Sequence, residues 1–285
     1  MLWRFCLYGF LKNQRYHEPF FVLALVEQGL SFLDIGLLVG FRELCVNLLE
    51  IPSGAIADLY GRRRSMVASF AAYIASFLLL AAAPGLGLLF LAMGLFAVGE
   101  AFRTGTHKAM IFEWLRAEGR EREKAAVYGY TRSWSKRGGA VGALIAAAIA
   151  WRAGALSTVF WFTTIPYAIN LINLATYPSY LEGQVSEVRA RPAEVLRLSL
   201  RGIGAALRLG GLRRLLGESM AFEGPHKLAR DYLQPLIELW VLGLPLAVWA
   251  SELGAAGDPA RGAFRGTVIA LSLVYFGLGL IESAA

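Results

Sequence analysis

The sequence predicts an all-α polytopic membrane protein, and three observations support that prediction. Apolar residues make up 56% of the 285 residues and charged residues only 17%, against about 45–50% and about 25% in soluble domains. The apolar residues are gathered in blocks of roughly 18–25 residues, the length that a helix needs to cross a bilayer. Basic residues are concentrated in alternate loops between these blocks. A large soluble core is excluded, because too few polar residues remain to cover it.

Eight helices are expected, in two bundles. Six form an N-terminal bundle over residues 1–181, and two begin a second, incomplete bundle over residues 215–285. A basic cytoplasmic linker, residues 182–214, connects them and contains an amphipathic stretch, 193–209, that is typical of a helix on the membrane surface. The helices are expected at Phe5–Leu30, Leu33–Ala57, Ser65–Ala83, Leu88–Leu115, Ala126–Trp151, Leu156–Tyr180, Leu215–Val248 and from Gly266 onward.

Charged loops between the helices set their orientation. The loops after the second, fourth and sixth helices contain the basic clusters Arg62–Arg64, Arg116–Lys124 and Arg189–Arg214, whereas the other loops contain almost no basic residues. Because basic loops remain in the cytoplasm, the N-terminus is expected there, and eight crossings return the chain to the same side. This orientation accounts for the net charge of +7 without a nucleic-acid partner.

Ionisable residues recur along one side of several expected helices. At about 100° per residue, spacings of three, four and seven keep such residues on one face. An ionisable residue at a helix centre costs roughly 2.5–3.5 kcal/mol on insertion scales, so these faces are expected to line a water-filled cavity or to meet one another. The residues predicted to line this cavity or to exchange protons are Arg15, Glu18, Glu43, Asn47, Glu100, Arg103, Glu223 and Arg230.

Structural ion pairing is the alternative interpretation of these residues. Glu100 and Arg103 lie three apart and can neutralise each other, and Glu223 with Lys227 is an ordinary i, i+4 pair. A carboxylate that titrates as the cavity opens would instead carry a proton, and Glu100 and Glu223 are the first candidates for that role.

The fifth expected helix combines basic residues with closely spaced glycines. Its basic residues lie near the cytoplasmic start and are expected to extend into the lipid headgroups. They are Arg132, Lys136 and Arg137. Its glycines are of the kind found where two membrane helices cross closely, so we predict an architectural role for them. They are Gly138, Gly139 and Gly142.

No cofactor, metal site or enzyme signature is expected. The two cysteines and three histidines have no metal-ligand spacing. The sequence also lacks a phosphate-binding loop, a Gly-x-Ser-x-Gly motif and a His-Glu-x-x-His motif. The missing phosphate-binding loop argues against a primary, ATP-driven pump on this chain.

The stretch Glu50–Arg64, between the second and third expected helices, resembles the loop motif of the major facilitator superfamily. A glycine, an aspartate, a second glycine and two arginines match the motif, whereas Leu59 replaces its usual basic residue. The matching residues are Gly54, Asp58, Gly61, Arg62 and Arg63. Gly54 is expected to permit a close helix contact, and Asp58 and Gly61 are expected to form the turn. The stretches Glu50–Gly54 and Gly99–Thr106 resemble bacterial members of the drug-exporter-like branch, and Arg103 is similar to the arginine of the superfamily's fourth helix.

This resemblance implies a secondary active transporter of the bacterial inner membrane. Such a protein moves a small organic solute by alternating access, and proton-coupled efflux, as in an antiporter, is the expected form. Its partners would be the lipid bilayer, the solute and protons. The five matching residues of the motif would form a cytoplasmic gate, with Asp58 and Arg62 at its centre.

The resemblance covers eight of the family's twelve helices, and the last apolar run, 268–281, ends inside the eighth. The chain is therefore expected to be C-terminally truncated, either as a fragment or as a shortened homologue that lacks the helix against which Asp58 would latch. The rival interpretation is a non-transporting membrane protein or an inactive fragment lacking four helices. An intramembrane enzyme is a third reading, and it would require two or more of the histidines to meet a carboxylate.

Overall fold

Helices are the regular secondary structure of this protein. The structure, a computed structural model, describes residues 1–82, 85–182 and 259–284, together with a few positions between 210 and 236. Within those ranges every regular element is an α-helix or a short 3-10 helix, so the predicted all-α fold is confirmed. The surface helix expected over 193–209 and the seventh helix, with Glu223 and Arg230, lie outside the described residues.

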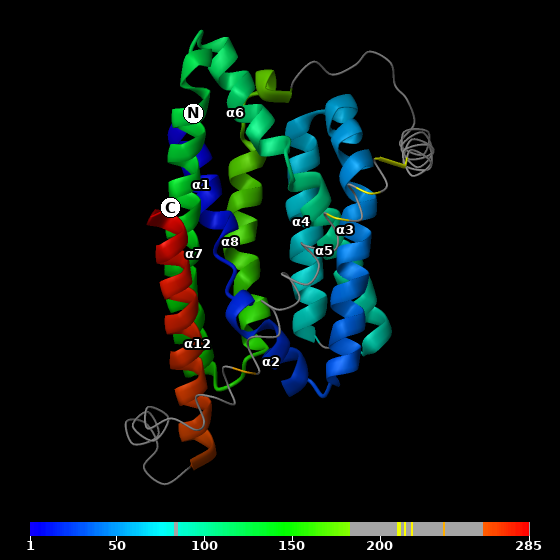
Figure 1. The fold of residues 1–285 in the computed structure, drawn as a ribbon, viewed down its shortest axis with the longest axis vertical. Coiled ribbons are helices and arrows are strands. Elements are labelled where there is room, and N and C mark those ends of the chain that lie inside the picture. The colour runs from blue at the N-terminus through cyan, green and yellow to red at the C-terminus, as the bar shows by residue number, and fades with distance from the viewer. Residues whose placement is uncertain are drawn as a thin grey trace.

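The described helices follow the expected order (Figure 1). Among the described residues, three segments are long and apolar enough to cross a membrane, namely Arg62–Ala82, Leu86–Ala117 and Thr158–Ala175. The α-helices are α1 (Leu2–Lys12), α2 (Phe21–Glu27), α3 (Phe32–Tyr60), α4 (Arg62–Ala82), α5 (Leu86–Arg103), α6 (Thr106–Ala117), α7 (Lys124–Ala153), α8 (Thr158–Ala175) and α12 (Pro259–Ala284). Three 3-10 helices cover Glu18–Phe20, Glu121–Glu123 and Ser179–Glu182.

The first expected helix is interrupted, which corrects the prediction of one helix over Phe5–Leu30. Helix α1 ends at Lys12, and the chain resumes helical structure only at the 3-10 helix Glu18–Phe20, which leads directly into α2. Pro19 has no backbone N–H and disfavours the helical conformation of the residue before it. The chain therefore runs irregularly from residue 13 to residue 17.

The fourth expected helix is also divided, into α5 and α6. Gly105 lies between them with φ +76°, a left-handed conformation that a continuing helix does not contain. Backbone at the depth of the membrane is left irregular only where it is buried in protein or lines a water-filled cavity. Both interruptions therefore indicate where such a cavity is to be found.

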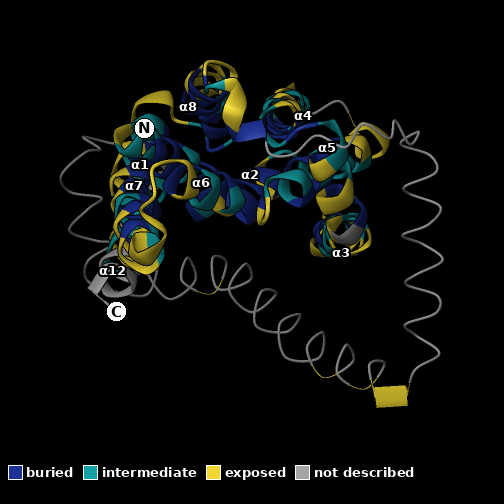
Figure 2. Cartoon of the chain, turned by 90° about the horizontal axis from the view of Figure 1, so that it is seen from above, coloured by how far each residue is buried: buried dark blue, intermediate teal, exposed yellow. Residues whose placement is uncertain are grey.

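The helices pack as two neighbouring groups. Helix α5 packs against α3 and α4, and α4 packs against α8; α7 packs against α1 on one side and α12 on another. Seen from above, α1, α7 and α12 lie at one end of the bundle and α3 at the other, with α6 between them (Figure 2). Helix α12, the expected eighth helix, therefore extends the bundle along α7.

Aromatic rings and serine hydroxyls hold α4 to its neighbours. Phe70, Tyr73 and Phe77 of α4 are at most 1% exposed, and all three contact Tyr167 of α8, with ring centroids 5.1–5.3 Å apart. On the other side of α4, Ser69 Oγ donates to the Gly99 carbonyl oxygen at 2.6 Å. Interhelical hydrogen bonds of this kind contribute about 0.6 kcal/mol each in a membrane.

The outer faces of the bundle are apolar, as contact with lipid requires. Four exposed residues of α8 recur at helical spacing, and their exposed fractions are 48–62%. They are Trp161, Ile165, Ile169 and Ile172. Exposed residues lie on the outer faces of the helices when the bundle is viewed from above (Figure 2). Such continuous apolar stripes are unusual for a soluble monomer and normal for a lipid-facing helix.

Candidate functional site

A cavity of about 350 Å³ lies where the first and fourth expected helices are interrupted. This volume falls within the range of roughly 300–1,000 Å³ that small-molecule sites occupy. Its lining includes the irregular segment after α1 and the junction of α5 with α6, and α7 supplies a third wall. Discontinuous helices at the depth of the membrane are the usual construction of transporter binding sites.

Side-chain amides stabilise the irregular segment that borders the cavity. Asn13 Nδ2 donates to the Ser135 carbonyl oxygen at 2.6 Å, and Gln14 Nε2 donates to the Gly138 carbonyl oxygen at 2.9 Å. The last carbonyl of α1, on Lys12, accepts a hydrogen bond from the Tyr167 hydroxyl at 3.2 Å. These bonds replace those that a continuous helix would make and so fix the cavity wall against α7 and α8.

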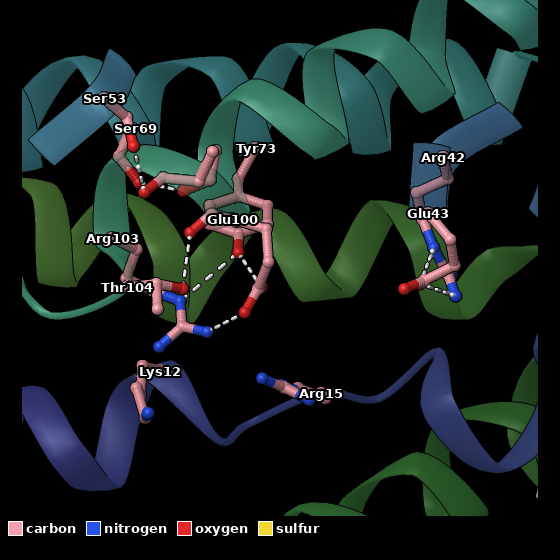
Figure 3. A network of polar contacts seen from close by, with 12 residues as sticks. Lys12, Arg15, Arg42, Glu43, Ser53, Ser69, Tyr73, Glu100, Arg103 and Thr104 are labelled. Carbon is pink, nitrogen blue, oxygen red and sulfur yellow. Dashed lines mark hydrogen bonds and ion pairs between the residues drawn. The ribbon is translucent and has the colours of Figure 1, made fainter. Parts of the chain in front are cut away.

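Arg103, at the end of α5, is the centre of a polar network beside the cavity. Its Nη2 is paired with Glu100 Oε1, its Nε donates to the Tyr73 hydroxyl at 3.3 Å, and that hydroxyl donates to Glu100 Oε2. The Arg103 guanidinium points across the cavity toward Lys12 and Arg15 on the first segment (Figure 3). Glu100 is therefore held on both oxygens, and Arg103 presents its charge to the cavity.

Of the predicted residues that the structure describes, three line this cavity and three do not. Arg15, Glu18 and Arg103 are lining residues, and Arg15 Nη1 lies 3.9 Å from Glu18 Oε2. Glu100 lies behind the wall, paired with Arg103. Glu43 is instead paired with Arg42, at 2.9 Å.

Asn47, the remaining described member of the predicted set, is exposed on α3 and lies outside the cavity lining. Spacing along α3 placed Glu43 and Asn47 on one face correctly. It did not show which neighbour that face meets, because periodicity alone carries no information on the partner.

Several residues that line the cavity were not predicted from the sequence. Arg132 and Lys136 were expected among lipid headgroups but instead line the cavity from α7, which corrects that prediction. Arg137, the third of these basic residues, is not part of the cavity lining, and its guanidinium lies 5.5 Å from the Trp134 ring centroid. The other missed polar lining residues include Lys12, Lys108, Tyr8 and Thr131. The sequence contains a pattern that indicates part of this set. Residues 128, 132 and 136 recur at intervals of four on α7, which places them on one face of the helix.

The predicted gate motif forms a network of ion pairs at the turn between α3 and α4. Asp58 Oδ1 lies 3.2 Å from Arg62 Nε, and Arg62 Nη1 lies 3.8 Å from Glu113 of α6. Arg63 Nε lies 2.9 Å from Glu182 Oε1 after α8, and Arg63 Nη1 donates to the Tyr177 carbonyl oxygen at 2.9 Å. The turn thus joins three loops at one end of the bundle.

The roles expected of individual motif residues are corrected in two places. Asp58 lies in the last turn of α3, and Gly61 alone, with φ +101°, connects α3 to α4. A Cβ added to Gly54 would have no described atom within 4 Å, so the described helices do not form the close contact expected there. The Asp58 side chain is 67% exposed, because it faces away from the described helices.

We expect Gly61→Ala to destabilise the protein, by about 1–3 kcal/mol, because a side chain at φ +101° is strained. The added Cβ would also lie 1.8 Å from Glu182 Oε2 and would displace the carboxylate that binds Arg63. The thermal midpoint of the purified chain in detergent measures the effect. Gly54→Ala is the matched control in the same motif, and equal midpoints for the two variants would contradict the prediction.

Comparisons with known proteins find multidrug transport and resistance proteins among the relatives of this chain. The chain is 27% identical over 244 residues to multidrug resistance protein MdtH of Yersinia pestis, covering 84% of this chain and 56% of that protein. It is 24% identical over 254 residues to multidrug transporter AQR1 of Candida glabrata, covering 82% of this chain and 40% of that protein. The chain thus spans about half the length of these relatives.

Solved transporter structures have the same fold. Nucleoside transporter NupG matches with a TM-score of 0.53 and 14% identity, covering 98% of this chain and 81% of that structure. Peptide transporter POT matches with a TM-score of 0.53 and 15% identity, covering 90% and 53%. The family model described as Major Facilitator Superfamily matches residues 15–281. This chain is therefore a multi-pass membrane protein that belongs to the Major Facilitator Superfamily.

Proposed function

We propose that this chain takes part in secondary active transport of a small organic solute by alternating access, in the form of proton-coupled efflux. The observation that supports this most is the position of the cavity, at the interruptions of the first and fourth helices and against α7. Membership of the superfamily and the printed names of its multidrug relatives are consistent with export. The proposed location is the bacterial inner membrane.

The proposed orientation places the N-terminus in the cytoplasm. The turn between α3 and α4 and the loop between α6 and α7 carry basic clusters. Ion pairs of Arg62 with Glu113 and of Arg63 with Glu182 join this turn to α6 and to the segment after α8 at one end of the bundle. Basic loops are retained in the cytoplasm. The Asp58–Arg62 pair at this end would act as the cytoplasmic gate, and the exposed Asp58 carboxylate is available to a partner from the second bundle.

Reconstitution into proteoliposomes tests the proposal. Uptake of an aryl cation (phenyltrimethylammonium), an aryl anion (phenyl phosphate) and thymidine would be measured with and without a pH gradient. Flux of at least one solute above that of empty vesicles is expected. The rival is a non-transporting membrane protein. It predicts no flux of any of the three solutes.

Glu100→Gln is expected to abolish stimulation of flux by the pH gradient while leaving downhill flux measurable. Glu100 is held by Arg103 and Tyr73, and any movement that separates it from Arg103 leaves a carboxylate in a low-dielectric site. A carboxylate in that position takes up a proton instead of remaining charged, and glutamine cannot do so. Glu223→Gln tests the second proposed carrier in the same assay.

The matched control for Glu100→Gln is Glu121→Gln. Glu121 lies in the exposed loop before α7, where its hydrogen bond from Arg116 and the charge of Lys124 lower its pKa. The control variant should retain the full response to the pH gradient. An unchanged response in both Glu100→Gln and Glu223→Gln would contradict the assignment of proton carriers while leaving transport itself intact.

A further inference from the structure

The described lining of the cavity carries an excess of positive charge. Its charged members are six cations and one carboxylate, Glu18. The cations are Lys12, Arg15, Arg103, Lys108, Arg132 and Lys136. If Glu100, which lies behind the wall, is added to the described lining residues, six cations still face only two carboxylates. Like charges gathered in a low-dielectric site repel one another, so a bound anion would stabilise this arrangement.

Three of these cations have no carboxylate within 4.0 Å among the described residues. They are Lys12, Lys108 and Arg132. Lys12 has Arg15, Arg103 and Arg132 within electrostatic range, together with one carboxylate, Glu100, so its surroundings are mainly cationic. Lys108 Nζ lies over the rings of Phe112 and Tyr128, 5.6 and 5.3 Å from their centroids. These interactions orient Lys108 without neutralising it.

Hydrogen-bond donors at the same wall add a second, independent indication. Helix α6 begins at Thr106, directly at the lining residue Gly105, and the first N–H groups of a helix have no acceptor within it. His107 lines the cavity, is only 9% exposed and stacks on Tyr8, with ring centroids 3.6 Å apart. Its Nε2 has no hydrogen-bond partner among the described residues. A helix N-terminus beside such a group is suited to an anion.

We propose that the solute bound in this cavity is a small organic anion, with a carboxylate or phosphate group placed between Lys12, Arg103 and Arg132 and an apolar part against Tyr8 and Phe5. This inference rests on the proposed transport function and adds its substrate class. The guanidinium groups supply paired donors that fit a planar carboxylate or a phosphate, and Lys12 supplies a point charge. The volume of about 350 Å³ admits one small solute.

Binding of matched aryl ligands to the purified chain in detergent tests the proposal. Phenyl phosphate and phenyltrimethylammonium share a ring and differ in charge, and constant ionic strength removes differences in screening. Calorimetry is expected to detect binding of phenyl phosphate and no binding of phenyltrimethylammonium. Lys12→Gln should raise the Kd for phenyl phosphate about tenfold, through the loss of one charge-assisted contact. Lys12→Arg, which keeps the charge, should stay within about twofold of the unmodified chain.

Further variants separate the cavity from general surface charge. Arg132→Gln is expected to weaken phenyl phosphate binding as Lys12→Gln does. Arg120→Gln, at an exposed arginine paired with Glu123 in the loop before α7, should leave the Kd unchanged. Thermal midpoints of the ligand-free variants confirm that each is folded. Equal weakening by Arg120→Gln and Lys12→Gln would overturn the proposal, because binding would then depend on surface charge alone.

Flux and binding together distinguish the failure of this inference from the failure of the proposed function. Transport of phenyltrimethylammonium or thymidine without phenyl phosphate would overturn the anion assignment and leave transport in place. Binding of phenyl phosphate without flux of any solute would support the anion site and overturn transport. Binding of phosphatidylglycerol nanodiscs without binding of phenyl phosphate would assign the site to a lipid headgroup and would overturn the solute assignment.

Discussion

Gly138→Ala is expected to destabilise the bundle by about 1–3 kcal/mol, although alanine is the better helix former. A Cβ added at Gly138 would lie 2.3 Å from the Phe10 carbonyl oxygen and 2.9 Å from Phe10 Cα. These are backbone atoms of α1, so the contact is relieved only by moving one helix away from the other. Overpacking of this kind costs about 1–3 kcal/mol, more than the roughly 1 kcal/mol of helix propensity that alanine adds.

Gly139→Ala is the control for Gly138→Ala, one residue along the same helix. A Cβ added there would have no described atom within 4 Å, so the substitution should leave the thermal midpoint in detergent unchanged or raise it. Gly142, one turn beyond Gly138, gives an intermediate case, because its Cβ would lie 3.2 Å from the Asn13 carbonyl oxygen. Equal midpoints for Gly138→Ala and Gly139→Ala would show that the contact between α1 and α7 does not limit stability.

The consequence of Gly138→Ala extends to the cavity. The Gly138 carbonyl oxygen accepts the hydrogen bond from Gln14, and the neighbouring Ser135 carbonyl oxygen accepts that from Asn13. Separation of α1 from α7 would lengthen both bonds, which hold the irregular segment carrying Arg15. The same contact between helices therefore stabilises the bundle and positions one wall of the cavity.

Most helix positions could be predicted from the sequence, but the positions at which the interruptions begin could not. Apolar blocks of sufficient length predict that a span exists, and the ends of α3, α4 and α7 lie within a few residues of expectation. The interruption after Lys12 depends on bonds from Asn13 and Gln14 to another helix. Such bonds replace local backbone pairing, and hydrophobic periodicity contains no information about them.

The candidate site was predicted less completely than the fold. The free-energy cost of a charge inside a membrane span predicted Arg15, Glu18 and Arg103 as lining residues, because such a charge needs a partner or water. The same argument failed for Arg132 and Lys136, since a basic residue near a helix start is explained equally well by extension into the headgroups. Only the packing of α7 against α1 decides between the two, and it turns the face of residues 128, 132 and 136 toward the cavity.

Arg103→Met is expected to be the most destabilising substitution in the polar network, by about 3 kcal/mol. It would remove the ion-pair partner of Glu100, whose side chain is 25% exposed, and leave only the Tyr73 hydroxyl on that carboxylate. Breaking a buried pair costs about 3–5 kcal/mol, and the lower end applies because the Glu100 side chain is partly exposed. The thermal midpoint and the urea or guanidinium midpoint in detergent measure the loss.

Removing both charges of this pair together should restore much of that stability. In Glu100→Met with Arg103→Met, no charge is left without a partner, so the double variant is expected to be more stable than Arg103→Met alone. The cycle of single and double variants then measures the coupling, and neighbours in direct contact should deviate from additivity by about 0.5–3 kcal/mol. Additive losses would mean that Glu100 is already compensated by Lys12 and Arg15 across the cavity. In that case Arg103 would be free to serve the bound solute alone, and the stability of the bundle would not depend on the pair.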